Sequence, residues 1–224
     1  MGLLLKILFV LLPPVFFLRS ESPLLLLLGL FLSTLLAWGM LRLRNKTWND
    51  VGFRKPENIG RLVLVTLVAT TVLIPLSFVA KHVVMIITET APNLDVFKVI
   101  QGNIPALMAG LVTAWIFGAF LEEFLFRGFL QNSLAELLSI KGCPRWIAWT
   151  GAVLVTSVLT GIGHYYQGIT GMVVAGFIAM GFSVIYLMNR RNLWSCILSH
   201  GLYDTGAFLL VYGGVHLDQI LFRS

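Results

Sequence analysis

The sequence predicts an all-α protein, a polytopic transmembrane helical bundle of about seven spans. Three observations lead to this fold class. Hydrophobic residues make up 58% of the 224 residues and charged residues only 12%, and the mean hydropathy is +0.89. A soluble domain carries about 25% charged residues. The third observation is the recurrence of apolar runs that approach the roughly 20 residues needed to cross a bilayer. A multi-pass location in the cell membrane follows.

Seven such runs occur along the chain, and each is predicted to form one spanning helix. The fourth is expected to continue past its two glutamates to Leu138, because no proline follows and Gly128 is only a weak break. Small residues within it (Gly110, Ala114 and Gly118) recur every four positions, which predicts close helix packing. The predicted spans are Leu3–Leu18, Pro23–Leu41, Leu62–Ala80, Ile104–Leu121, Trp146–Gly163, Ile169–Met188 and Leu193–Tyr212.

Basic residues cluster in short connectors between the apolar runs. The connector from Arg42 to Arg61 is the richest, whereas the opposite set of connectors holds few cations, such as Lys81 after the third span. The positive-inside rule therefore predicts a cytoplasmic N-terminus. A net charge of +6 could indicate a nucleic-acid surface in a soluble protein. Here the basic residues lie in the connectors, and they form no basic patch with interleaved aromatic residues. A lipid bilayer is therefore the expected partner, and nucleic acid is not.

Ionisable residues interrupt three of the apolar segments. Each charge placed at bilayer depth costs at least about 2.5–3.5 kcal/mol, so we expect these side chains to converge on one polar site. Convergence requires either a fourth helix that runs on toward Leu138 with its glutamates in mid-span, or a fifth helix that starts deeper in the membrane. The candidate site residues are Glu122, Glu123, Arg127, His164, His200 and Asp204.

Helical spacing predicts two pairs among these residues. Glu123 and Arg127 are four positions apart and share a helix face, with the acid before the base. Glu122 lies about 100° further around the helix and has less access to that cation. His200 and Asp204 also share a face. Each pair could instead serve as an independent structural clamp between helices, an alternative that spacing alone leaves open.

The residue types favour direct activation of water. Ser199 precedes His200 but points to another face, and no serine or cysteine is clearly placed beside a base. A carboxylate with a histidine can deprotonate water, while the other polar groups hold the oxyanion that forms on a peptide carbonyl. A zinc ion held by His164, His200 and Glu122 is the alternative, although no HExxH motif is present. A proton-relaying transporter is a further possibility.

The order of these motifs resembles the CAAX protease and bacteriocin-processing family, also called the Abi family. That family is described by EExxxR, then FxxxH, then HxxxN or HxxxD. The resemblance covers residues 120–204. The matching residues are Glu122-Glu123-xxx-Arg127, His164 and His200-xxx-Asp204.

Two further features bear on the resemblance. The stretch Trp48–Arg54 is similar to the family's cytoplasmic connector, chiefly through Trp48, Gly52 and Phe53. One position departs from the pattern, because Thr160 occupies the phenylalanine position of FxxxH. This substitution changes the expected shape of the pocket, but the histidine of the motif, His164, is still present. The implied organisation is a segment 1–100, with N-terminal transmembrane helices and the basic cytoplasmic connector, followed by a protease-like core at 101–215.

The resemblance implies an intramembrane endopeptidase that acts on a membrane-anchored peptide or protein, of CAAX type or related. It favours a metal-free glutamate mechanism over zinc. Asp204 stands where many members have Asn, so it would either donate as a neutral acid or accept from the neighbouring histidine. The alternative function is a catalytically silent membrane scaffold or a bacteriocin-immunity-like binding protein. The implied roles are water activation by Glu122 and His164, oxyanion support by His200 and Asp204, and orientation by Glu123 and Arg127.

Overall fold

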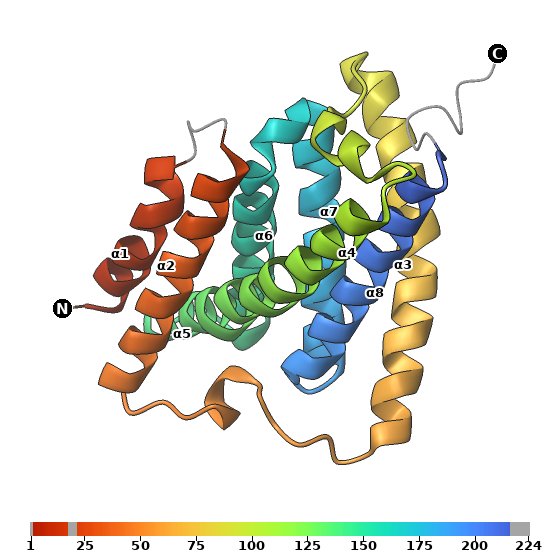
Figure 1. Cartoon of the computed structure of the whole chain (residues 1–224). Coiled ribbons are helices and arrows are strands. Elements are labelled where there is room, and N and C mark those ends of the chain that lie inside the picture. Colours follow the sequence, from red (N-terminus) through yellow and green to blue (C-terminus); the bar gives the residue numbers. More distant parts are fainter. Residues whose placement is uncertain (1, 18–21, 216–224) are drawn as a thin grey trace.

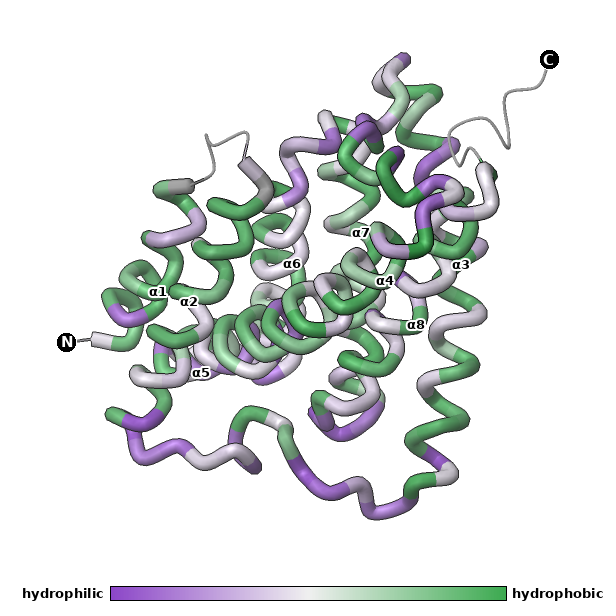
Figure 2. The backbone as a smooth tube through the Cα atoms, in the orientation of Figure 1, coloured by the Kyte–Doolittle hydropathy of each residue, from purple (hydrophilic) through white to green (hydrophobic). Residues whose placement is uncertain are grey.

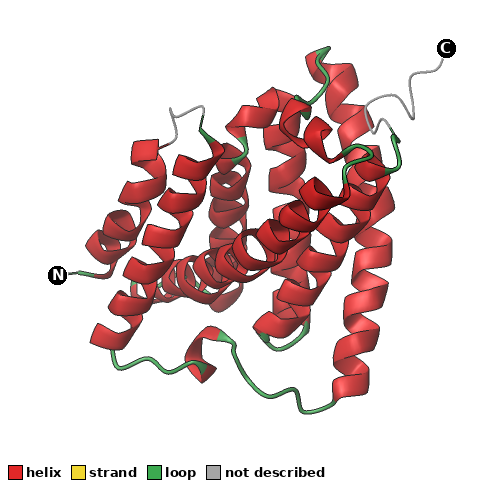
Figure 3. Ribbon diagram, viewed as in Figure 1, coloured by secondary structure: helices red, strands yellow, loops and turns green. Residues whose placement is uncertain are grey.

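The computed structural model describes residues 2–17 and 22–215. Across these residues every regular element is a helix and no strand occurs (Figure 3). Short helical turns lie at Asn49–Val51 (η1), Asp95–Ile100 (η2) and Tyr165–Gln167 (η5). The longer α-helices are α1 (Leu3–Phe17), α2 (Pro23–Leu43), α3 (Ile59–Thr88), α4 (Ile104–Thr113), α5 (Asn132–Ile140), α6 (Arg145–Gly163), α7 (Gly168–Met188) and α8 (Leu193–Tyr212).

The helices have the lengths and composition of a membrane bundle. In the part of the chain that the structure describes, five helical segments are long and apolar enough to cross a membrane. They are α2, α3, the helix from Ile104 to Ile140, α6, and α7 with the preceding turn. Figure 2 shows hydrophobic residues along the helices and hydrophilic residues gathered in connectors. The predicted polytopic helical bundle is confirmed, and the protein is a multi-pass membrane protein.

The two remaining predicted spans are also helical. The first forms α1, which ends at Phe17 and is shorter than a typical span; Leu18 lies outside the described residues. The seventh forms α8, which has 20 residues but carries His200 and Asp204 and is therefore less apolar. The cytoplasmic N-terminus and the division at residue 100 stay predictions.

The predicted fourth span is the beginning of one continuous helix of 37 residues, Ile104–Ile140. The side chain of Asn103 caps its first turn. Hydrogen bonding in the middle, over Ala114–Glu122 (η3) and Phe124–Gln131 (η4), is of the wider π type, from each N–H to the carbonyl five residues earlier. The helix crosses the bundle obliquely (Figure 1). The predicted continuation to Leu138 is confirmed, and the glutamates lie in mid-helix.

Helix α3 corrects one prediction. The predicted third span stops at Ala80 and leaves Lys81 in a connector, whereas α3 continues to Thr88. Lys81 is only 9% exposed, and its ammonium lies 5.2 Å from the centre of the Phe78 ring. The placement of Lys81 in a connector was wrong. A lysine can remain inside an apolar helix because its long aliphatic stem packs with apolar neighbours while the charge reaches a polar or aromatic partner.

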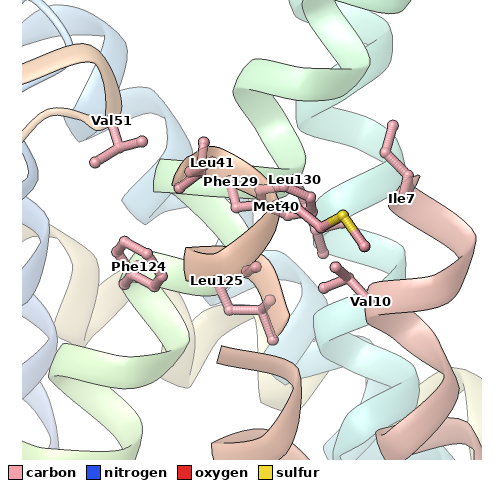
Figure 4. Packing of buried hydrophobic residues seen from close by; sticks show 10 residues of the cluster. Ile7, Val10, Met40, Leu41, Val51, Phe124, Leu125, Phe129 and Leu130 are labelled. Carbon is pink, nitrogen blue, oxygen red and sulfur yellow. The ribbon is translucent and has the colours of Figure 1, made fainter. Parts of the chain in front are cut away.

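Two apolar clusters hold the bundle around the long helix. On one side α1 and α2 pack against its second half, and the hydroxyl of Ser33 on α2 donates to the carbonyl of Val10 on α1 at 2.6 Å. On the other side lie α7 and α8, with α3 packed against both. Figure 4 shows the first cluster: Ile7, Val10, Met40, Leu41, Val51, Phe124, Leu125, Phe129 and Leu130.

The connector between α2 and α3 is fastened to the connector between α7 and α8. The N–H of Leu193 donates to the carbonyl of Gly52 at 2.9 Å, and the guanidinium of Arg54 donates to the carbonyl of Arg190 at 2.6 Å. Gly52 has a φ of +101°. A Cβ built there would lie 2.6 Å from the carbonyl oxygen of Arg191. Both the backbone conformation and the close approach therefore require glycine.

Gly52→Ala is expected to lower the free energy of unfolding by about 2 kcal/mol or more, because a Cβ adds a steric clash to an unfavourable φ. Gly102→Ala is the matched control. Gly102 also has a positive φ, +63°, but no atom lies within 4 Å of a Cβ built there, so about 1 kcal/mol is expected. Denaturant unfolding of the purified protein in detergent measures both losses. Equal losses would contradict the role given to the connector contact.

Candidate active site

A buried ionic cluster joins the long helix to α8. Glu123 is 0% exposed and Arg127 is 1% exposed. Nη1 of Arg127 lies 3.2 Å from Oε1 of Glu123, so the predicted pairing of these residues is confirmed. The same carboxylate oxygen accepts a hydrogen bond of 2.8 Å from Nδ1 of His200. Glu123 is therefore held between a guanidinium on its own helix and an imidazole on another.

Arg127 extends the cluster to a third helix. Its Nη2 donates to the carbonyl of Ala179 on α7 at 2.5 Å, and its guanidinium lies 5.8 Å from the centre of the Phe182 ring. A buried charge is tolerated only when it is paired and hydrogen-bonded. Arg127 is paired with Glu123, donates to the α7 carbonyl and lies against the aromatic face, while its Nε and Nη1 make no hydrogen bond to a described residue. These contacts fix how the long helix sits against α7.

His200 links the cluster to Asp204. Its Nε2 lies 3.4 Å from Oδ2 of Asp204, one turn further along α8, as their shared helix face predicted. The imidazole ring stacks on Phe182, with centroids 4.6 Å apart and planes 20° from parallel. Gly118 on the long helix leaves room for both groups, because a Cβ built there would lie 3.2 Å from Oδ2 of Asp204. Ring stacking and the neighbouring glycine together set the position of the imidazole.

His164 lies immediately after α6. Its Nδ1 lies 2.9 Å from the carbonyl oxygen of Thr160, one turn earlier. A carbonyl can only accept, so Nδ1 carries the hydrogen and Nε2 of the neutral ring is left as an acceptor. The hydroxyl of Thr160 donates to the carbonyl of Thr156 at 3.0 Å. The residue that departs from the FxxxH pattern therefore orients the histidine through its main chain, which needs no particular side chain.

One cavity of about 270 Å³ brings five of the six candidate residues together. Glu123, the sixth, is absent from the lining and lies behind it, bonded to His200. The rest of the wall is mostly apolar and comes from α3, α7, α8 and the η2 region, including Phe78, Phe97 and Phe208. The candidate residues that line the cavity are Glu122, Arg127, His164, His200 and Asp204.

Three positions in or beside this cavity were not singled out from the sequence. Lys81 and Tyr203 line it, and the hydroxyl of Tyr203 donates to Ser77 on α3 at 2.8 Å. For Gly118 the four-residue spacing predicts helix packing and no contact with the site. The signal for Lys81 was a lone cation directly after an apolar run, and the signal for Gly118 was its position one turn before Glu122. Neither signal indicates which helix the residue would contact.

The donor set does not fit the three-ligand zinc site considered above. In the described ranges 2–17 and 22–215, no three His, Cys, Asp or Glu side chains are grouped so that they could hold a metal ion. His200 is turned toward Glu123 through Nδ1 and toward Asp204 through Nε2. No step of the chemistry is therefore derived through a metal.

Residues 103–206 match the family model described as Type II CAAX prenyl endopeptidase Rce1-like. These residues form an Rce1-like segment. It begins at Asn103, which caps the long helix, and ends two residues beyond Asp204, so it contains all six candidate residues, the whole long helix and the larger part of α8. The resemblance to the CAAX protease and bacteriocin-processing family is confirmed. Comparison with curated proteins and with solved structures gives no match.

Proposed function

We propose that the Rce1-like segment is an intramembrane endopeptidase in which Glu122 and His164 activate water for attack on a peptide bond. The observation that carries the proposal is the shared cavity. A carboxylate, a histidine with an acceptor nitrogen and a His–Asp pair line one space of about 270 Å³ inside a bundle of membrane helices. Intramembrane ionisable residues that face a common cavity are functional by default.

The two glutamates have different surroundings, which supports different roles. Glu123 is engaged by Arg127 and His200. Glu122 makes no hydrogen bond or ion pair with any other residue of the described chain, and it lines the cavity. An unengaged carboxylate can accept a proton from water, and Nε2 of His164 can share that proton. Glu123 serves as a positioning residue that holds the His200 ring.

The proposed reaction is hydrolysis of a peptide bond by one water molecule. The water oxygen bonds to the peptide carbonyl carbon as its proton passes to Glu122 or His164, and the carbonyl oxygen becomes an oxyanion. An imidazole between two carboxylates can donate from both nitrogens, so His200 can give a hydrogen bond to that oxyanion beside Asp204. The stored proton then passes to the leaving nitrogen as the C–N bond breaks. Two products form, one new carboxyl group and one new amine.

Ser77 is the serine in the cavity wall, and its hydroxyl donates to the carbonyl of Ile74 at 2.7 Å. Two further candidate nucleophiles, next to His200 and one turn before it on α8, are also hydrogen-bonded elsewhere. Ser199 donates its hydroxyl hydrogen to the carbonyl of Thr66 on α3, at 3.5 Å. Cys196 is buried and directs its sulfur to the carbonyl of Phe182 at 3.3 Å. Neither residue lines the cavity. This geometry favours water over a serine or cysteine as the nucleophile.

The apolar wall suggests the substrate class. Phe78, Phe97 and Phe208 line the same cavity as the polar residues, so a peptide with a membrane anchor or an attached lipid near its scissile bond would bury apolar surface on binding. We assign a membrane-anchored, CAAX-type or related substrate on this basis together with the family description. The reaction is proposed to need no metal.

Cleavage assays with the purified protein in liposomes test this function. The substrate pair is one peptide sequence carrying a C-terminal farnesyl–cysteine motif and the same sequence without the lipid. We expect cleavage of the lipidated peptide, weaker cleavage of the other, and no loss after treatment with a strong zinc chelator. Chelator-sensitive cleavage would contradict the metal-free mechanism. Absence of cleavage by folded protein would favour the scaffold or immunity-like role.

Gly118→Val is expected to lower the cleavage rate by about 100-fold, because displacement of a catalytic group by about 1 Å has that effect. The new side chain would push against Asp204 and His200, which a Cβ at this position already approaches to 3.2 and 3.6 Å. Gly39→Val is the control, since a Cβ at Gly39 meets no atom within 4 Å. Single-turnover rates in liposomes give the comparison. A control variant that is equally slow would contradict the role given to Gly118.

A further inference from the structure

A second, larger cavity of about 630 Å³ lies at the end of the bundle where α2, α5 and α7 end and α6 begins. In Figure 1 the connector between α2 and α3 runs along the lower edge of the bundle, below the turn between α7 and α8. No residue of this cavity lines the candidate active site. Five cations and two carboxylates line it, an excess of three positive charges: Arg44, Lys46, Arg54, Arg145 and Arg191 with Asp50 and Glu136.

The backbone holds these like charges together. Asn192 donates its side-chain amide to the carbonyl of Arg54 at 3.1 Å, which adds to the bonds that fasten Gly52 and Arg54 to the turn after α7. Arg190 and Arg191 have φ values of 53° and 61°. Two successive residues other than glycine in the left-handed region carry a conformational cost, and such strain collects at functional sites.

The acidic residues compensate the cations only in part. Glu136 is paired with Arg44 at 2.5 Å. Asp50 is turned toward its own loop, where the backbone N–H and then the hydroxyl of Thr47 bond its carboxylate and hold the pKa of Asp50 below its usual value. Arg191 lies over the Trp149 ring at 5.4 Å. The remaining charge is positive and faces the cavity.

Two of the cations are the strongest evidence that an anion binds in this cavity. Lys46 lies in the connector after α2, Arg145 is the first residue of α6, and both line the cavity. Among residues 2–17 and 22–215, neither side chain makes a hydrogen bond or ion pair. Lys46 also acts on Asp50 through its charge, but the cations of the cavity outnumber its carboxylates. Converging cations in such excess repel one another unless an anion binds between them. Arginine in particular matches phosphate oxygens with paired N–H donors.

We propose that this basic cavity binds a phosphate group, supplied by the headgroup of an anionic membrane phospholipid. The cavity lies at the ends of membrane-spanning helices, which is the level of lipid headgroups, and basic pockets between such helices are suited to phosphate-bearing lipids. Trp146, next to Arg145, is 71% exposed, as expected for an aromatic residue at the membrane interface. The proposal also assigns a function, phosphate binding, to the Trp48–Arg54 stretch.

Lipid binding to the full-length protein in detergent tests the proposal. Phosphatidylglycerol, phosphatidylcholine and inorganic phosphate are titrated separately, and the shift of the thermal unfolding midpoint gives an apparent Kd. We expect phosphatidylglycerol to stabilise the wild type at concentrations where phosphatidylcholine does not. Each cation contributes a factor of about 5 to such binding, so the double variant Lys46→Gln/Arg145→Gln should bind about 30-fold more weakly.

The control is Lys55→Gln/Arg61→Gln, which removes the same charge from exposed positions outside the cavity. It should keep wild-type affinity. Equal weakening in both double variants, or equal stabilisation by phosphatidylcholine, would overturn the proposal. Inorganic phosphate that reproduces the full shift, with the same dependence on Lys46 and Arg145, would support the phosphate site and identify a soluble source. This binding measurement is independent of peptide hydrolysis.

Discussion

Replacing Glu122 by Gln is expected to lower the rate of peptide cleavage by about 10²–10⁴-fold, the usual contribution of a general base. Glutamine keeps the size of the side chain and loses the ability to take a proton from water. Glu122 makes no hydrogen bond or ion pair within the described residues, so the fold should be unaffected. Single-turnover cleavage of the lipidated peptide in liposomes measures the rate, and thermal unfolding checks the fold.

The matched control for this result is Glu89→Gln. Glu89 is exposed at the end of α3 and does not line the cavity, so its loss removes one carboxylate without touching the site. We expect a wild-type rate. A Glu122→Gln protein that cleaves at the wild-type rate would show that the base is another group. Such a result would indicate that Glu122 has a structural role.

The second large effect is expected at Arg127. Arg127→Met would leave Glu123 as a fully buried carboxylate without its guanidinium partner, and breaking such a pair costs about 3–5 kcal/mol. The double variant Glu123→Gln/Arg127→Met removes both charges and should be clearly more stable than Arg127→Met alone. Denaturant unfolding in detergent gives the free energies of the wild type, both single variants and the double variant.

This cycle distinguishes an ionic cluster from general packing. If Arg127 contributes mainly through its volume, the double variant should be at least as unstable as Arg127→Met. If the uncompensated charge dominates, neutralising Glu123 restores part of the loss. Recovery is expected to be incomplete, because the carbonyl of Ala179 loses its donor and His200 faces an amide in place of a carboxylate.

The local part of the site could be predicted because helical spacing determines it. The pairs Glu123–Arg127 and His200–Asp204 follow from four-residue separations, and the continuous helix past the glutamates follows from the absence of proline. All of these are found at ion-pair distances or as intact helix. The apolar runs likewise predicted the helices, because the number of consecutive apolar residues can be compared directly with the thickness of a bilayer.

The contacts between helices could not be predicted in this way. Nothing in the spacing indicates that His200 would bond Glu123, 77 positions earlier, or that Gly118 would face Asp204. Such contacts depend on the oblique course of the long helix. Lys81 is a further case, because a cation directly after an apolar run predicts the end of a span, whereas helix α3 continues to Thr88. Spacing likewise does not indicate that five cations, from two connectors and from the start of α6, share one cavity.

The most direct test of the central claim is mass spectrometry of the products formed from the farnesylated peptide in liposomes. Wild type, Glu122→Gln and His164→Ala run in parallel, each shown to be folded. Water activation by these residues predicts that the wild type cuts one peptide bond, with the mass of one water added across the two fragments. Both variants should give almost no product. Fragments that persist undiminished in either variant, or a folded wild type that yields none, would contradict it.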